Sequence, residues 1–493
     1  MARPRSGEGL DSVYQRLPQV PPEEVHTTGN ELQVEDEEVL AEEFVSQEAS
    51  VSADSRIQWI HFILGCAVLL PWNVMITATP YFLARLSGSP FKSTFSSYLT
   101  TTFTLANFGF LAHATMTSKQ SSNERRILVS ILFTAIMVAM LTLSTFVHIP
   151  AGLFFGFVLL NGIAQAAAGS YLQTAVVAVA SLFGPTAMQA VMSGQAAVAV
   201  AVSLVQAISA YASVRGQAPS EAYVLEAEPE ERSAFFFFGL STIFLLISAG
   251  AQTWLVRLPA YKAIVGQFKH IKHVVHGDVD DGAETSNLIH QTAAASSLER
   301  RDQIIRVAKE NGVYNFAVAY VFIITLAVFP SITLSILPTN PSTHPLVFSA
   351  VHFLVFSVGD FFGRYMCAFP RLTIWSANRL LTLSLCRTLF IPIFLMCNIQ
   401  RPSVQTSHSA IISSDILYMF ILLLLGLSNG WISSLCMMAA PSVQHNPRLK
   451  GRVEDVDVAA TVASFCLIGG LFVGSFASFA VRAAVCDCNP FRN

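Results

Sequence analysis

Long apolar stretches recur throughout this 493-residue sequence and constrain its fold more than any other feature. About 20 apolar residues suffice for a helix to cross the hydrocarbon core of a bilayer. Eleven windows of roughly this length cover residues 58–82, 95–117, 127–147, 152–181, 189–213, 233–257, 313–337, 345–368, 376–398, 413–438 and 459–483. Because lipid cannot hydrogen-bond to a backbone, such spans must be helices. The sequence therefore predicts an all-α polytopic membrane protein with eleven transmembrane helices.

The overall composition agrees with this prediction and excludes several classes of partner. Hydrophobic residues make up 53% of the chain and charged residues only 12%, with a formal net charge of −3. Binding of nucleic acid would need a concentrated basic surface, which this balance does not provide. Cys486 and Cys488 lack the further ligands of a zinc site. We therefore expect no nucleic-acid partner, no metal and no cofactor.

The distribution of Lys and Arg predicts the topology. Basic residues concentrate in the connections expected to be cytosolic, above all in the central one, which places the N-terminus in the cytosol and the C-terminus in the extracellular space or an organelle lumen. We expect a six-helix bundle at residues 57–257, a cytosolic linker at 258–312 and a five-helix bundle at 313–483, followed by a short non-cytosolic tail at 484–493. The two bundles are expected to be arranged as in the major facilitator proteins.

Residues 1–56 contain thirteen Asp or Glu and four Arg, with no apolar period. Such a composition is typical of a disordered, acidic cytosolic tail. Within it, the residues from Tyr14 to Leu17 have the form of a tyrosine-based sorting signal, which would bind a sorting adaptor and direct the protein to a vacuole or lysosome. The alternative is an ordinary stretch of solvated tail, which leaves the plasma membrane as the other location.

Asp360 and Arg364 lie one helical turn apart in the eighth apolar window. A lone charge near the centre of a membrane helix costs about 2.5–3.5 kcal/mol on the insertion scale, so such residues persist where they meet each other, water or a substrate. Phe353 and Ser357 precede the pair at spacings that place all four on one helix face. The pair is therefore the first candidate for a substrate site. An ion pair that only locks helices together would produce the same pattern.

Two prolines interrupt apolar windows, Pro71 in the first and Pro330 in the seventh. Proline cannot donate the backbone hydrogen bond of a helix interior, so both positions are expected to bend or open the helix. Trp72 and Asn73 follow Pro71 and are candidates for a site or gate, the alternative being a structural kink with Trp72 at the lipid interface. In the fifth window, Gly194 is expected to allow close helix packing.

Four further polar residues lie inside apolar windows. Gln165 is interpreted as a hydrogen bond between helices, whereas Gln173 stays open between this role and a site. Arg387 has no acid on its own helix, so it needs either a partner across the bundle, for which Asp360 is the candidate, or a cage of backbone carbonyls, and a structural role is favoured. His352 is offset from the Asp360 face and is typical of a packing histidine rather than a proton relay.

Six motifs in order identify a family. They are LLPWNVMITATPYF at residues 69–82, VMSGQ at 191–195, FP at 329–330, GDFFGR at 359–364, CRTLFIPIFLMCNIQ at 386–400 and GLSNGWISSLCMMAAP at 426–441. Together they resemble the equilibrative nucleoside transporters, with fungal and intracellular members the most similar. The resemblance runs across residues 57–483 and does not cover the acidic tail.

The resemblance implies roles for individual residues. Trp72 would lie beside a central cavity with Leu69 and Asn73 near it, and Gln173 would read the edge of the base. Asp360 and Arg364 would face the ribose hydroxyls. The expected pocket neighbours are Phe329, Phe353 and Ser357. Ser357 replaces a common asparagine and Ile76 a common methionine, which bears on base selectivity.

On this resemblance we expect facilitated, alternating-access transport of nucleosides such as uridine and adenosine, and of nucleobases as a further class, driven by the substrate gradient. No oligomer is required. A proton-linked variant, including export from an acidic organelle, is the alternative, because Asp360 could titrate if Arg364 moved away. A receptor or enzyme is disfavoured, because the spans carry no nucleophile and base in a suitable pattern.

Overall fold

The computed structural model is helical throughout its described parts. These are residues 39–51, 54–92, 94–118, 123–147, 149–215, 228–276, 286–330, 332–340, 343–398 and 411–486. Within these ranges no strand occurs beyond one isolated bridge between Cys397 and Ile412. The prediction of an all-α protein is thus confirmed.

The first half of the chain comprises α2 to α8. Their bounds are Ser55–Thr77 (α2), Thr79–Arg85 (α3), Phe95–Met116 (α4), Asn123–Ser144 (α5), Ala151–Leu182 (α6), Gly184–Arg215 (α7) and Glu228–Arg257 (α8). The linker helices are α9 (Pro259–His276) and α10 (Ser286–Glu310). The second half comprises α11 (Gly312–Val328), α12 (Pro345–Met366), α13 (Ala377–Cys386), α14 (Phe390–Leu395), α15 (Asp415–Ala439) and α16 (Val456–Cys486).

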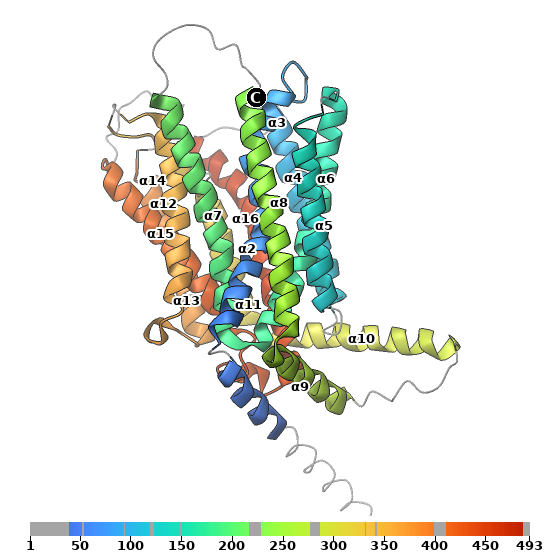
Figure 1. The fold of residues 1–493 in the computed structure, drawn as a ribbon. Helices are drawn as coiled ribbons and strands as arrows, with labels where there is room; N and C mark the ends of the chain where they lie inside the picture. Colours follow the sequence, from blue (N-terminus) through green and yellow to red (C-terminus); the bar gives the residue numbers. More distant parts are fainter. Residues whose placement is uncertain are drawn as a thin grey trace, which may run out of the picture.

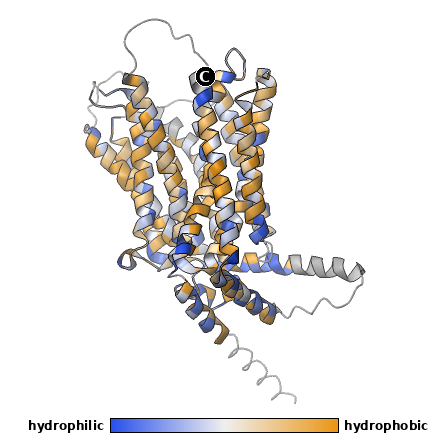
Figure 2. Cartoon of the chain, in the orientation of Figure 1, coloured by the Kyte–Doolittle hydropathy of each residue, from blue (hydrophilic) through white to orange (hydrophobic). Residues whose placement is uncertain are grey.

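The long helices stand side by side, while α9 and α10 lie at one end of the bundle (Figure 1). We call that end the linker face and the other the opposite face. The axes of α10 and α11 differ by 74° across the break at Asn311, so α10 runs across the end of the bundle. Hydrophobic residues follow the upright helices, and hydrophilic ones gather toward the ends and on α9 (Figure 2). Exposed Leu160, Leu240 and Ile416 are the side chains expected of lipid-facing surfaces.

The predicted count of eleven transmembrane helices is not confirmed. Among the described residues, nine helices are long and apolar enough to cross a membrane, or ten if α10 and α11 form one broken span. Helix α4 does not qualify, and its sequence gives the reason. Ser96, Thr100, Thr104 and Asn107 lie along it and line a cavity described below, and these polar side chains lower the mean hydropathy of the helix.

The acidic N-terminal segment was expected to be disordered, and this is wrong for its last part. Residues 39–51 are helical, with Phe44 fully buried and its ring 6.3 Å from that of Phe268 on α9. An apolar side chain at a helical position thus docks this segment onto the linker, despite its overall charge. The sorting motif from Tyr14 to Leu17 and the last residues, 487–493, lie outside the described residues.

Among the helix pairs that glycines bring into backbone contact, two lie beside the interface between α7 and α12. A Cβ on Gly65 of α2 would meet the Val191 carbonyl of α7, and one on Gly194 of α7 would meet the Phe62 carbonyl of α2. Helices α12 and α15 approach in the same way through four glycines, Gly359, Gly363, Gly426 and Gly430. We call these contacts the glycine seams. Each seam joins two helices within one half of the chain.

The two halves meet along α7 with α12 and along α6 with α16. Most of the side-chain hydrogen bonds between them lie toward the linker face. Gln173 on α6 donates to Ser464 on α16 at 2.9 Å, and Gln189 on α7 donates to the carbonyl of Arg364 on α12 at 3.3 Å. The halves are therefore held together mainly in the part of the bundle next to the linker.

Candidate functional site

A cavity of about 610 Å³ extends inward from the opposite face. Its wall runs from Thr79 and Ser96, near that face, to Gln173 in the part of α6 closer to the linker. The helices α2, α4, α6, α11 and α16 all contribute to it. This volume lies within the range of roughly 300–1,000 Å³ that is usual for small-molecule sites.

Aromatic rings form two parts of the cavity wall. The Trp72 ring on α2 lies 4.4 Å from that of Phe103 on α4, and Phe108 of α4 stacks on Phe472 of α16 at 4.5 Å with an interplanar angle of 8°. Flat apolar surfaces of this kind accept planar ligands by stacking. Helix α2 remains helical through Pro71, which also lines the cavity, so the expected opening of the helix at this residue does not occur.

Polar groups reach the cavity from α4 and α6. The Ser170 hydroxyl donates to the Asn107 side-chain carbonyl at 2.7 Å, so this bond does not use the Asn107 amide nitrogen. Gln173 uses its amide nitrogen on Ser464. Gln165 is fully buried, and its nitrogen donates to Asn161 of the same helix at 2.6 Å and to the Met75 sulfur of α2 at 3.6 Å, the second of which is a bond between helices. The wall therefore combines a mainly apolar surface with a few amides and hydroxyls, as ligand sites do.

Asp360 and Arg364 form a direct ion pair, with Arg364 Nε 2.9 Å from Asp360 Oδ2. Asn429 on α15 donates to the other carboxylate oxygen at 2.6 Å. The Arg364 guanidinium also donates to the Met192 carbonyl of α7 at 3.1 Å. Both charged residues are only 6% exposed, and neither belongs to the cavity wall formed by the described residues. In this conformation the pair instead connects the two halves, through Met192.

Arg387 does not pair directly with Asp360, and of the two expected kinds of partner the structure shows a backbone carbonyl. Arg387 donates to the Leu425 carbonyl at 3.2 Å, to Ser428, and to the Thr325 hydroxyl at 2.7 Å. Thr325 in turn donates to Asn429, which binds Asp360. Two uncharged side chains, Thr325 and Asn429, thus stand between Arg387 and the carboxylate. The other acceptors of Arg387 are the Leu425 carbonyl and the Ser428 hydroxyl, and Arg364 pairs with Asp360 directly.

The remaining sequence candidates divide between the cavity and the helix contacts. Leu69, Phe329 and Pro330 line the cavity with Trp72 and Gln173. Asn73 instead donates to the Leu69 carbonyl on its own helix at 2.9 Å. Ser357 shares a hydrogen bond with Ser203 of α7 at 3.0 Å, and Phe353 meets the Phe329 ring edge-on at 5.3 Å. Gly194 belongs to a glycine seam.

A family model described as "Nucleoside transporter" matches residues 162–483, about two-thirds of the chain. The chain belongs to the nucleoside transporter family. This nucleoside transporter is similar to equilibrative nucleoside transporter 1 of Rattus norvegicus, with 26% identity over 86% of the chain and 96% of the relative. Nucleoside transporter FUN26 of Saccharomyces cerevisiae is 22% identical, over 85% and 82%.

Solved transporters of the major facilitator superfamily are also similar. The proton:xylose symporter XylE aligns with 88% of this nucleoside transporter at 11% identity, with a TM-score of 0.49. This backbone likeness is weak.

Several cavity residues of this nucleoside transporter escaped the sequence interpretation. Phe103, Asn107 and Phe108 belong to α4, for which no candidate was named, and Phe472 lies on α16. The run of hydroxyl residues from Ser96 to Thr104 was the available signal, since a helix facing only lipid and packing partners would not carry it.

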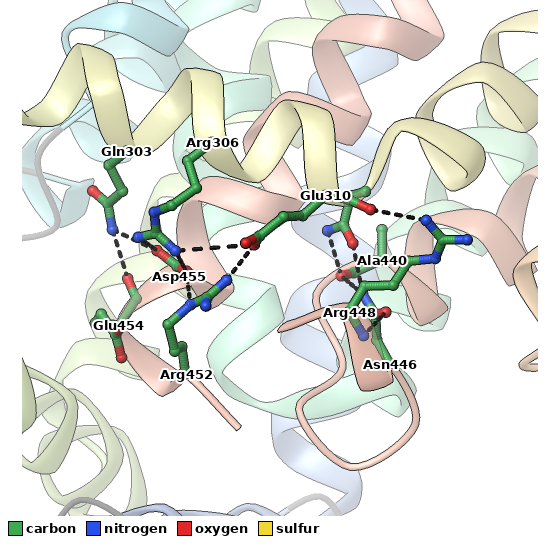
Figure 3. Close-up of polar contacts among 10 residues, drawn as sticks. Gln303, Arg306, Glu310, Ala440, Asn446, Arg448, Arg452, Glu454 and Asp455 are labelled. Carbon is green, nitrogen blue, oxygen red and sulfur yellow. Dashed lines mark hydrogen bonds and ion pairs between the residues drawn. The ribbon is translucent and has the colours of Figure 1, made fainter. Parts of the chain in front are cut away.

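An ionic cluster at the linker face also escaped it (Figure 3). Asp455, just before α16, is buried and accepts hydrogen bonds from Arg306 and Arg452 at 2.8 Å each. Arg452 also pairs with Glu310 of α10. Nearby, Lys272 of α9 lies 3.0 Å from Asp457 of α16. Because α9 continues from α8, this last pair ties the first half to the second.

Proposed function

We propose that this protein carries out facilitative, alternating-access transport of nucleosides, and of nucleobases as a further class, driven by the substrate gradient. The observation that supports this most is the cavity of about 610 Å³, which extends from the opposite face and ends at Gln173, where the halves are bonded together. One accessible end and one closed end are what an alternating-access transporter presents in one of its states. Membership of the nucleoside transporter family supplies the substrate class.

The cavity wall suits an uncharged nucleoside. The rings of Trp72 and Phe103 offer a surface for the flat base, and Gln173 an amide for its edge. The wall contains no Lys or Arg among the described residues, so nothing there would neutralise a phosphate group. We therefore infer selection of nucleosides over nucleotides.

Asp360 and Arg364 would act on the substrate in a later step of the cycle. Here both carboxylate oxygens are bonded, and Arg364 holds the Met192 carbonyl across the interface of the halves. Separation of α7 from α12 would break that last bond and free guanidinium donors. The freed N–H groups of Arg364 would then donate charge-assisted hydrogen bonds to the ribose hydroxyls.

Closure of the linker face would rest on the bonds between the halves. Gln173 with Ser464, Gln189 with the Arg364 carbonyl, and Lys272 with Asp457 must all open before substrate can leave on that side. When the linker face opens and the opposite face closes, bonds between the halves are broken at one face and formed at the other. The substrate gradient is then sufficient to drive transport, and no external energy source is needed.

Uptake by purified protein in proteoliposomes tests this proposal. We expect saturable uptake of radiolabelled uridine and adenosine without any ion gradient, and mutual competition between the two. Uridine monophosphate is the matched control and should not compete, because it adds only a phosphate. Absence of uptake for both nucleosides would refute the proposed function.

The second candidate is proton-linked nucleoside transport, including export from an acidic organelle. It is favoured by one observation, the buried titratable carboxylate of Asp360 at the interface of the halves. The same proteoliposomes with and without an inward pH gradient separate the two modes, since only coupled transport accumulates substrate above equilibrium.

We further propose that the N-terminus is cytosolic and the C-terminus extracellular or lumenal, and that the residues from Tyr14 to Leu17 recruit a sorting adaptor to a vacuolar or lysosomal membrane rather than the plasma membrane. A fluorescent fusion compared with its Tyr14→Ala variant tests the location. Redistribution of the variant to the plasma membrane is expected.

A further inference from the structure

A second, smaller cavity lies in the second half of the chain, close to the opposite face. Its volume is about 70 Å³, enough for at least two waters at roughly 30 Å³ each. It is enclosed between the 3₁₀ turn η2 (Thr333–Ser335) with the residues that follow it and the first turns of α12. Leu337 at its rim is 39% exposed. The cavity therefore lies just beneath the surface of that end.

Three polar atoms at this small cavity make no hydrogen bond of normal geometry, although the Ser349 backbone lies near the His352 ring. They are Nδ1 and Nε2 of His352 and the hydroxyl oxygen of Thr333. His352 is 1% exposed and Thr333 is 2% exposed, so bulk water does not serve them. An unsatisfied buried polar atom costs about 1–3 kcal/mol, and native proteins commonly supply an ordered water instead. A cavity of suitable size with three unpaired polar atoms is thus a site for bound water.

The ring of Phe329 separates this cavity from the larger one. It lies 4.9 Å from the His352 imidazole and also lines the substrate cavity. On its other sides the imidazole meets Phe353 at 4.9 Å and the Tyr418 ring at 6.4 Å. A change in charge or hydration at His352 would therefore act directly on a side chain of the substrate cavity.

Among the described residues, no charged group pairs with the His352 imidazole. Tyr418 of α15 directs its hydroxyl to the Thr333 carbonyl at 3.2 Å, and Asp415 uses both carboxylate oxygens on the backbone of Thr339 and Asn340. His344 caps the start of α12, and Asp360, eight residues further along, is bonded to Arg364 and Asn429. Cys397, after α14, is the remaining titratable neighbour of Tyr418. A positive charge on the ring would depend on water for its solvation.

From this geometry we propose that His352, Thr333 and the small cavity form a binding site for water and a proton, and that proton uptake there shifts the transporter away from the present conformation. In this conformation an imidazolium would have only the few waters of the small cavity to solvate it, so protonation favours a state in which segment 332–340 opens and the ring reaches bulk water. Protons enter from the opposite face. This inference rests on the proposed transport function and adds a pH dependence to it.

Uridine exchange at equal pH on both sides of proteoliposomes tests the site without any proton gradient. The quantity compared is the ratio of the exchange rates at pH 5.5 and pH 7.5. We expect this ratio to differ from one by about threefold in the wild-type protein, because a histidine that reaches bulk water, as in the proposed open state, titrates near pH 6.5. In His352→Leu the ratio should return to near one. The matched control His344→Asn keeps an N-cap acceptor on the same helix and should retain the wild-type ratio.

Two further measurements separate the possible failures. Thr333→Val removes the hydroxyl at the small cavity and keeps the titrating ring of His352. The midpoint of the pH profile should move to lower pH, because the water that solvates the imidazolium loses one hydrogen-bond partner. Thermal unfolding in detergent needs no transport, and the wild-type Tm should fall more than that of His352→Leu between pH 7.5 and 5.5. Equal pH dependence of wild type and His352→Leu in both assays would overturn the inference. Absence of uridine exchange with the expected Tm difference would instead refute only the proposed function.

Discussion

Two buried polar clusters lie on the same helix, α12, and are built in opposite ways. In the Asp360 cluster both carboxylate oxygens have a partner, Oδ2 in Arg364 and Oδ1 in Asn429. The His352 cluster, eight residues or about 12 Å toward the opposite face, leaves both ring nitrogens and the Thr333 hydroxyl unpaired.

The difference separates what holds this conformation from what would release it. Removing one partner of a buried ion pair costs about 3–5 kcal/mol, so the Asp360 cluster stabilises the arrangement it is part of. An unpaired neutral group costs energy in this state and gains it back in a state where water reaches it. The predictions below test this contrast, beginning with the largest expected effect.

Asp360→Asn should have the largest effect. It leaves the buried Arg364 guanidinium without its counter-charge, so we expect a loss of about 3–5 kcal/mol in stability and at least a tenfold loss of uridine uptake, measured by thermal unfolding and proteoliposome flux. The double variant Asp360→Asn with Arg364→Met should regain Tm but not uptake. Recovery of uptake in the double variant would show that the pair is only structural.

Sequence patterns predicted the helical fold and the pairing of Asp360 with Arg364, because apolar length and one-turn spacing are local properties. They could not show that this pair lies outside the cavity, since its partners Asn429 and Met192 come from other helices. The pairing of Arg387 was missed for the same reason: Thr325 and Ser428 satisfy it from two different elements. His352 was interpreted as a packing residue, and only the three-dimensional structure shows its unpaired nitrogens.

Trp72→Ala tests whether the cavity, rather than the ion pair, selects the base. Loss of the stacking surface beside Phe103 should lower kcat/KM for adenosine about tenfold, equivalent to about 1.4 kcal/mol. Trp59→Ala is the matched control on the same helix, since Trp59 is 65% exposed on the outside of the bundle. Equal losses in both variants would contradict a substrate role for Trp72.

Glu48 is another titratable residue, and unlike His352 it lies outside the membrane spans. Burial near Gly184 raises the pKa of this carboxyl from 4.5 to about 7, so docking of residues 39–51 binds a proton. Docking is thus strongest below pH 4.5 and weakens as the pH rises through 7. Hydrogen exchange of this helix, corrected for intrinsic rates, should lose about tenfold protection between pH 6 and 8. Glu48→Gln should show no such change.

The pair of Lys272 and Asp457 should give the smallest effect. Asp457→Asn removes its charge, while Lys272, whose side chain is 22% exposed, can turn to water. We expect about a threefold change in uridine exchange, as for a partly exposed ion pair. The control is Arg56→Ala, which removes an exposed pair with Asp54 and should leave exchange unaltered. A tenfold effect of Asp457→Asn would place this pair with the Asp360 cluster.

The glycine seams have a mechanical consequence. Where two backbones touch, no side chain lies between them to absorb a displacement by changing rotamer, so α2 moves with α7, and α12 with α15. A nucleoside that pushes on Trp72 of α2 would thus displace α7, whose Met192 carbonyl holds Arg364 of α12. The two seams act as rigid levers, and they meet at the surfaces where α7 contacts α12 and α15.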